Sequence, residues 1–227
     1  MSLFCVSLSA QTSDLLRVSI LGDSYSTFDG WMQPEWNAVW YFPETSEWTN
    51  VNNDVKRVEQ TWWHQLVTDM GYVLEKNNSF SGATICYSGY PDQSGKHRDY
   101  SDRSFIGRAS DLGHPDIILV CGGTNDSWCG APVGEYKWDE WTNEDLYQFR
   151  PAMAKMCSEL KTLYPKARIV FILNSELRDD INDSVHTICK HYNMEYVDLQ
   201  DIEKQAGHPS QAGMRAFSLQ VESQLNK

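Results

Sequence analysis

Positive charge is scarce in this chain of 227 residues: 19 Lys and Arg stand against 31 Asp and Glu, which gives a formal net charge of −12 at pH 7. Nucleic acids and anionic membranes repel such a protein, so neither is expected as its main partner. No stretch reaches the roughly 18 apolar residues of a membrane-spanning helix, and we expect no integral membrane segment. These absences predict a soluble protein and leave its function and oligomeric state open.

Motifs for metal, phosphate and redox chemistry are also missing. No metal-ligand spacing of His, Cys and carboxylates occurs, and there is no glycine-rich phosphate loop. We therefore expect neither a metal nor another cofactor. The six cysteines form no CxxC pair, and most are expected to be small core residues. A disulfide such as Cys121–Cys129 stays open, because sequence alone does not assign pairing.

The N-terminus differs from the rest of the chain. Residues 3–10 are apolar and end in small residues, like the second half of a secretory signal, although the basic segment that opens such signals is missing. We expect residues 1–14 to be a signal-peptide remnant or a disordered N-terminus, and the protein to be secreted or periplasmic. No linker, repeat or low-complexity tract follows, so residues 15–227 are expected to form a single domain.

Apolar runs alternate with helical patterns along this domain. The runs at 117–121 and 169–173 are apolar throughout, as is typical of strands buried on both faces of a parallel sheet. Between them, apolar residues recur at steps of three and four, and Pro151 predicts a kink or a restart in this helix. Further strands are expected near 17–21, 72–76 and 195–199, and further helices at 58–70, 181–192 and from about 210. The order predicts an α/β fold of three α/β/α layers, doubly wound, with a flavodoxin-like five-stranded parallel sheet.

A serine stands where the first of these strands ends, in Gly22-Asp23-Ser24-Tyr25-Ser26. The strand fixes its backbone, Gly22 permits a tight turn, and the Ser24 hydroxyl can stand clear of the sheet edge, as a nucleophile requires. Ser and Asp are equally common at the start of a helix, so this block alone is ambiguous.

Three more blocks follow in order: Ser79–Thr84, Gly122–Asp126 and Gly207–Ser210. With Ser24, Gly82, Asn125 and His208 at their centres, the four blocks resemble those of the SGNH (GDSL-type) hydrolases, over residues 17–221. The resemblance implies a serine esterase whose nucleophile is Ser24. It also implies an oxyanion site formed by the backbone N–H groups of Ser24 and Gly82 and the side-chain amide of Asn125. Such donors are worth about 3 to 4 kcal/mol each in acyl transfer.

A serine hydroxyl needs a base within hydrogen-bond reach, and His208 is the natural candidate because it directly precedes the last helix. His97, in a polar loop near the second block, stays open as an alternative. Asp23 and Asp126, beside the nucleophile and the oxyanion donor, are expected to accept hydrogen bonds from loop amides rather than to serve as the acid of a triad.

The chain departs from the family pattern at one position. The family usually has an aspartate three residues before the histidine, where this chain has Gln205. A neutral amide can orient the imidazole ring but does not stabilise the imidazolium that forms. We expect a Ser-His dyad oriented by Gln205 or a backbone carbonyl, with Glu203 and Asp201 as candidate replacement acids. A catalytically weak enzyme stays open.

Two aromatic groups suggest the substrate. One lies between residues 28 and 63 and the other between 128 and 141, and both are expected to leave the carboxyl edge of the sheet, where ligands bind. They form either an accessory core or stacking platforms for a sugar, with Trp31 and Trp128 as candidate substrate contacts. We expect O-deacetylation of a carbohydrate, and hence a small-molecule or glycan ester as partner. A lipid or lysophospholipid esterase, an acyltransferase and a non-catalytic glycan-binding relative are the alternatives.

Overall fold

The structure is a computed structural model that describes residues 15–227. Residues 1–14, on which the expected export signal falls, lie outside the described residues. Among the helices of the described part, none combines the length and the apolar character that crossing a membrane requires.

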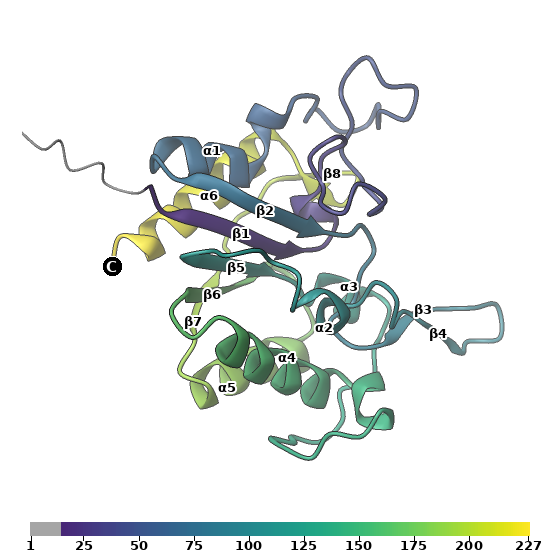
Figure 1. The fold of residues 1–227 in the computed structure, drawn as a ribbon. Coiled ribbons are helices and arrows are strands. Elements are labelled where there is room, and N and C mark those ends of the chain that lie inside the picture. The colour runs from purple at the N-terminus through teal and green to yellow at the C-terminus, as the bar shows by residue number, and fades with distance from the viewer. Residues whose placement is uncertain (1–14) are drawn as a thin grey trace, which may run out of the picture.

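A five-stranded parallel sheet forms the centre of the molecule (Figure 1). Its strands are β1 (Arg17–Gly22), β2 (Val73–Ser79), β5 (Ile117–Cys121), β6 (Arg168–Leu173) and β7 (Glu195–Asp198). Their order across the sheet is β2-β1-β5-β6-β7, which confirms the predicted flavodoxin-like arrangement. The order of the strands reverses between β1 and β5, and open α/β sheets bind ligands at such a switch point.

The strand register brings the ends of three strands together. Gly22, at the end of β1, pairs with Ser79 at the end of β2 and with Cys121 at the end of β5. The three carboxyl ends therefore lie level at one edge of the sheet. As a result, the blocks that follow these strands in the sequence start side by side.

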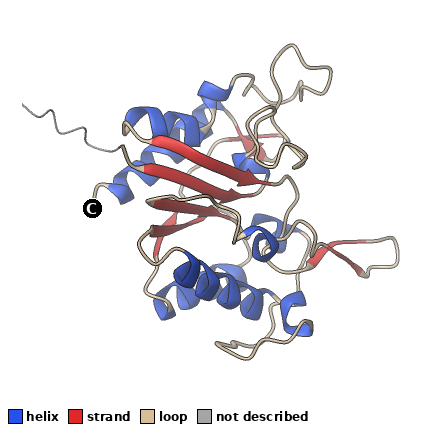
Figure 2. Ribbon diagram, in the orientation of Figure 1, coloured by secondary structure: helices blue, strands red, loops and turns tan. Residues whose placement is uncertain are grey.

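Helices cover both faces of the sheet, as the three-layer prediction requires (Figure 2). One face carries α1 (Trp62–Asp69) and α6 (Gln211–Leu225), and the other carries α4 (Phe149–Leu163) and α5 (Asp179–His191). Each face has its own buried core because side chains alternate along the strands. In β5, Ile117 and Leu119 belong to the core under α1 and α6, whereas Ile118 and Val120 belong to the core under α4 and α5.

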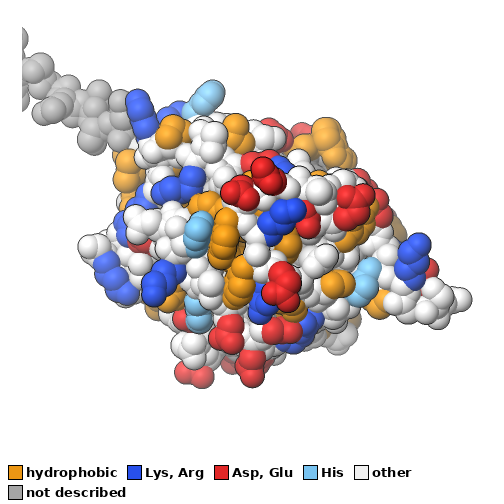
Figure 3. All heavy atoms as spheres, turned by 90° about the horizontal axis from the view of Figure 1, so that it is seen from below, with side chains coloured by type: hydrophobic (Ala, Val, Ile, Leu, Met, Phe, Trp, Pro, Cys, Tyr) orange, Lys and Arg blue, Asp and Glu red, His pale blue; other side chains and the backbone are white. Residues whose placement is uncertain are grey.

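Short elements fill the connections. They are the helices α2 (Phe105–Arg108) and α3 (Thr124–Trp128), the 3₁₀ turns η1 (Ser24–Ser26), η2 (Val58–Gln60) and η3 (Glu144–Tyr147), and the strands β3 (Ser88–Pro91), β4 (His97–Asp99), β8 (Lys204–Gln205) and β9 (His208–Pro209). The β3–β4 hairpin projects from the body of the molecule (Figure 1). On the face seen in Figure 3, acidic, basic and apolar side chains are interspersed.

Near Pro151, where a kink or a restart is expected, the helix restarts. The 3₁₀ turn η3 ends at Tyr147 and α4 begins at Phe149, which places Pro151 in the first turn of α4, where backbone N–H groups have no partner within the helix. The expected helix at 58–70 is interrupted by Thr61, whose extended backbone and side chain cap the start of α1. The five cysteines within residues 15–227 are buried and free, so the Cys121–Cys129 disulfide is absent.

The contact between α1 and α6 allows a test of the core. Trp62 and Phe217 stack with ring centroids 4.4 Å apart, and both side chains are fully buried. We expect Phe217→Ala to lower the free energy of unfolding by about 3 to 5 kcal/mol, because it leaves a large cavity. Urea denaturation measures this loss, with the exposed Leu219→Ala on the same helix as the control. Equal losses for the two variants would show that the stack does not join these helices.

Candidate active site

The turn after β1 holds Ser24 in place. Gly22 has no room for a side chain, since a Cβ there would lie 2.5 Å from the Ser79 hydroxyl oxygen. Asp23 then caps the 3₁₀ turn η1, and its Oδ1 accepts a hydrogen bond of 3.0 Å from the Tyr25 N–H. The tight packing at Gly22 and this cap fix the backbone of Ser24, whose hydroxyl faces His208.

Ser24 and His208 are brought together from opposite ends of the chain. The Nε2 atom of His208 lies 2.9 Å from Ser24 Oγ, and both residues are buried. Three side chains hold the backbone around His208. The Tyr25 hydroxyl donates to Gly207 O, the Tyr41 hydroxyl donates to Pro209 O, and the Asn53 amide donates to several carbonyls of this loop.

The tautomer of His208 follows from its second nitrogen. Nδ1 lies 3.2 Å from the carbonyl oxygen of Ala206, which can only accept, so Nδ1 carries the proton and Nε2 is the acceptor facing Ser24. Burial lowers the pKa of His208 to about 4, and the nearby positive charge of Lys204 contributes in the same direction. The ring is therefore neutral at pH 7 and able to take a proton.

Within residues 15–227, the hydrogen bonds of this ring go to Ser24 and to the Ala206 carbonyl and not to any of the three side chains named as orienting groups. Gln205 Oε1 instead accepts from the Asp54 N–H at 2.9 Å. Glu203 accepts from the Ser210 hydroxyl at 2.5 Å, and Asp201 is exposed to solvent.

The correction has a backbone origin. Ala206 and Gly207 both have positive φ angles, 50° and 76°, in the tight turn between β8 and β9. This turn directs the Ala206 carbonyl back to the ring of His208. The backbone-carbonyl alternative is therefore the one that the geometry favours.

Asn125 has its amide orientation fixed on both sides. Its Nδ2 donates to the Ala83 carbonyl at 3.0 Å, and its Oδ1 accepts from the Tyr90 hydroxyl at 2.9 Å. Because a carbonyl cannot donate, this pair of contacts places the nitrogen correctly. The second N–H of the amide then stays available for a ligand. Tyr90, on the β3 strand of the projecting hairpin, carried no signal in the sequence.

Gly82 follows β2 with a φ of 81°, a backbone conformation that favours glycine. Its N–H makes no hydrogen bond within residues 15–227. No other group lies within 4 Å of the position that a Cβ would take. The glycine is therefore favoured by its backbone conformation, and its N–H is available to a ligand.

Buried charges hold the blocks together. The Asp126 carboxylate accepts from the Ile85 and Cys86 N–H groups, at 2.8 and 3.2 Å, which confirms its expected role toward loop amides. Burial raises the pKa of Asp126 and that of Asp23. The guanidinium of Arg108 donates to the carbonyl of Gly22 at 3.2 Å and so ties α2 to the end of β1.

The two candidate substrate contacts lie in different places. Trp128 is half exposed, and its ring lies edge-on to His208 with a centroid distance of 6.0 Å. Trp31 packs instead against Trp63 and His64 of α1, and it makes no ring contact with His208 in the described part of the chain.

The sequence prediction missed Trp40, which stacks on the His208 ring with centroids 3.7 Å apart and an interplanar angle of 9°. It lies in the predicted aromatic segment, but nothing in the sequence distinguishes it from its neighbours there.

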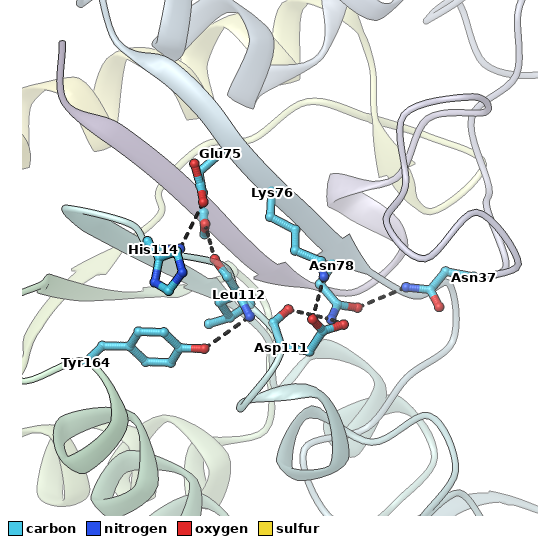
Figure 4. A network of polar contacts seen from close by, with 9 residues as sticks. Asn37, Glu75, Lys76, Asn78, Asp111, Leu112, His114 and Tyr164 are labelled. Atoms are coloured by element: carbon cyan, nitrogen blue, oxygen red, sulfur yellow. Dashed lines mark hydrogen bonds and ion pairs between the residues drawn. The ribbon is translucent and has the colours of Figure 1, made fainter. Parts of the chain in front are cut away.

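A separate polar network anchors the aromatic segment to the sheet (Figure 4). Asn37 Nδ2 donates to Asn78 Oδ1 at 3.0 Å, and Asn78 Nδ2 donates to the Asp111 carbonyl at 3.0 Å. His114 belongs to the far end of this network, where its backbone N–H donates to Glu75 Oε1.

The alternative base His97 contacts the Gly89 carbonyl in the β3–β4 hairpin and does not face Ser24. Within residues 15–227, no group of three His, Cys, Asp or Glu is placed to hold a metal.

The comparisons with known proteins agree with this geometry. The family model of the GDSL-like lipases/acylhydrolases matches residues 16–225, and the chain belongs to this family of ester hydrolases. Two crystal structures assigned to GDSL-like lipases are similar to it. The protein from Bacteroides ovatus is 49% identical, with a TM-score of 0.89 over 94% of this chain and 99% of its own. The protein from Bacteroides uniformis is 50% identical, with a TM-score of 0.89 over 94% and 97%.

A more distant structure, a family two carbohydrate esterase from Clostridium thermocellum in complex with cellohexaose, is 14% identical. It has a TM-score of 0.57 over 94% of this chain and 65% of its own, and this likeness shows the fold alone. No curated protein matches the sequence.

The buried ring of His208 makes stability depend on pH. Its pKa is about 4 in the folded protein against 6.5 ordinarily, so the unfolded chain binds a proton that the folded protein does not between these values. We expect the contribution of His208 to the free energy of unfolding to fall as pH drops through this window, by up to about 3 kcal/mol. Burial raises the pKa of Asp23 and Asp126, which act with the opposite sign, so the contribution of His208 is the difference between two proteins. Denaturation of the wild type and of His208→Gln at pH 4.5 and pH 7 measures it, and the wild type should lose more stability than the variant. An equal loss in both proteins would contradict the burial of a neutral ring.

Proposed function

We propose that this protein hydrolyses carboxylic esters through an acyl-enzyme, with Ser24 as nucleophile and His208 as general base. The observation that carries the proposal is the 2.9 Å contact between Ser24 Oγ and His208 Nε2, in a pair whose imidazole is neutral and protonated on Nδ1. Membership of the GDSL-like lipase/acylhydrolase family supports it.

In the first step, the Ser24 O–H bond breaks and its proton moves to Nε2 of His208. The oxygen electron pair forms a bond to the ester carbonyl carbon, and the π pair of the carbonyl moves onto its oxygen. Collapse of this tetrahedral species expels the alcohol, which takes the proton from His208. Water then repeats the sequence on the acyl-enzyme and releases the acid.

The oxyanion that forms needs donors that are already in place. We assign this role to the backbone N–H groups of Ser24 and Gly82 and to the amide of Asn125. The fixed orientation of the Asn125 amide supports the assignment, since its second N–H needs no rotation to donate. The Gly82 N–H, which has no hydrogen-bond partner within residues 15–227, supports it in the same way.

The site is proposed to work as a dyad. The Ala206 carbonyl holds the ring of His208 in the useful tautomer but carries no full negative charge. The alternative of a non-catalytic glycan-binding relative rests on Gln205 at the usual acid position. The intact contact between Ser24 and His208 favours the enzyme.

For the substrate we propose the O-acetyl group of a carbohydrate. Trp128 stands half exposed beside His208, and aromatic rings of this kind stack on sugar faces. Trp36 and Trp48, in the segment before α1, are also exposed. The fold shared with carbohydrate esterases is compatible with this choice. A lipid ester would be better served by aliphatic surfaces than by indoles.

A first test removes the nucleophile. We expect Ser24→Ala to lower kcat for p-nitrophenyl acetate by about 10³-fold or more, because no other hydroxyl replaces the attacking atom. Initial rates of hydrolysis measure the effect, with Ser94→Ala in the exposed β3–β4 turn as the control. Equal rates for Ser24→Ala and the wild type would remove the enzyme proposal.

A second test concerns the missing acid. Gln205 Oε1 accepts from the Asp54 N–H, and we expect an aspartate at this position to face that N–H rather than the ring. We expect Gln205→Asp to change kcat for p-nitrophenyl acetate by no more than about two-fold, far less than the 10⁴-fold effect of a coupled triad acid. A tenfold gain would show that the Ala206 carbonyl is not the orienting group.

A third test addresses the substrate class. We expect release of acetate from acetylated xylo- and cello-oligosaccharides to exceed release of fatty acid from lysophosphatidylcholine at equal ester concentration. Trp128→Ala should raise KM for the oligosaccharides and leave p-nitrophenyl acetate nearly unaffected, because stacking contributes about 0.5 to 1.5 kcal/mol of binding. Preferential cleavage of the lipid would replace the carbohydrate assignment.

A further inference from the structure

The proposed mechanism creates a positive charge on His208, a buried side chain whose surroundings destabilise that charge. When His208 takes the proton of Ser24, its ring becomes an imidazolium, yet the residue is only 7% exposed and so has little access to water. Its Nδ1 partner is the neutral carbonyl of Ala206. The formal charge that acts on its pKa is that of Lys204, which has the same sign. Some other group must therefore stabilise the cation.

Trp40 is placed to do this. Its ring lies parallel to that of His208, with centroids 3.7 Å apart and an interplanar angle of 9°. The face of an indole carries negative potential, and among aromatic side chains it attracts a cation most strongly. The other aromatic neighbours, Tyr25, Tyr41 and Trp128, are inclined to His208 by 56° to 83° and lie 5.1 to 6.2 Å away.

Hydrogen bonds of the backbone fix the position of Trp40 relative to Ser24. The backbone N–H of Trp40 donates to Thr27 Oγ1 at 3.0 Å, and the same hydroxyl donates to the Ser24 carbonyl at 2.9 Å. The next residue, Tyr41, accepts at its carbonyl from the Asp29 N–H at 3.0 Å. One short network thus fixes the backbones of Ser24 and Trp40 relative to each other.

We propose that Trp40 is a positioning residue that stabilises the imidazolium of His208 through its π face, in place of the carboxylate found in a triad. The inference rests on the proposed function and extends it. It explains how a buried dyad with no acid on its histidine can still move a proton. A cation–π contact of this kind accelerates the step between about 2-fold and 30-fold.

The decisive experiment changes the electronics of Trp40 while keeping its shape. Site-specific incorporation of mono-, di- and trifluorotryptophan at position 40 withdraws electron density from the ring face and leaves the stack in place. We expect kcat/KM for p-nitrophenyl acetate to fall stepwise with each fluorine, mainly through kcat. The full series should span up to about 30-fold.

The chain offers a matched control. Trp138 stacks on His191 in the same way, with centroids 3.9 Å apart and an interplanar angle of 13°, away from Ser24. The same fluorinated series at position 138 should leave kcat/KM unchanged. A flat response at position 40, or an equal response at both positions, would overturn the proposal.

A second readout does not depend on activity. The pKa of His208, about 4, is accessible by NMR titration of the ring protons in the full protein. If the π face stabilises the cation, fluorination at position 40 lowers this pKa further, and an unchanged pKa contradicts the proposal. The proposed function fails by a different result. If the protein has no esterase activity that depends on Ser24, the proposed function is wrong whatever the titration shows.

Discussion

The contact between Ser24 Oγ and His208 Nε2 is the interaction on which the whole site depends. It joins two residues 184 positions apart, and it exists because the turn after β1 and the turn before α6 end at the same edge of the sheet. The parallel sheet supplies the edge, and Gly22, Asp23 and Arg108 hold the first turn rigid. The hydroxyls of Tyr25 and Tyr41 hold the second.

Neutral groups position most of the side chains around this contact. A backbone carbonyl fixes the histidine tautomer, an indole lies over the ring, and a tyrosine hydroxyl orients the Asn125 amide. The buried carboxylates of Asp23 and Asp126 serve the loops rather than the histidine. The site therefore keeps its imidazole neutral at rest, and in the proposed reaction neutral groups would have to stabilise the charge of the imidazolium.

The fold could be predicted from the sequence because it follows from strong, repeated signals. Fully apolar runs such as 117–121 indicate strands buried on both faces, and their alternation with helices leaves few possible topologies. The convergence of the three blocks that follow β1, β2 and β5 was predictable for the same reason, since carboxyl ends of parallel strands share one edge. The group that orients His208 could not be predicted, because it is a main-chain carbonyl. A positive φ at Ala206, which an alanine seldom adopts, places it. Trp40 was one of nine tryptophans, and only the tertiary structure selects it.

The most direct measurement of the central claim is covalent labelling by a serine-directed alkyl fluorophosphonate, followed by mass spectrometry of the intact and digested protein. The account predicts one phosphonyl group per chain, on Ser24, formed at a rate that His208→Ala reduces by several orders of magnitude. Labelling at another residue, or labelling of Ser24 that is indifferent to His208, would contradict it.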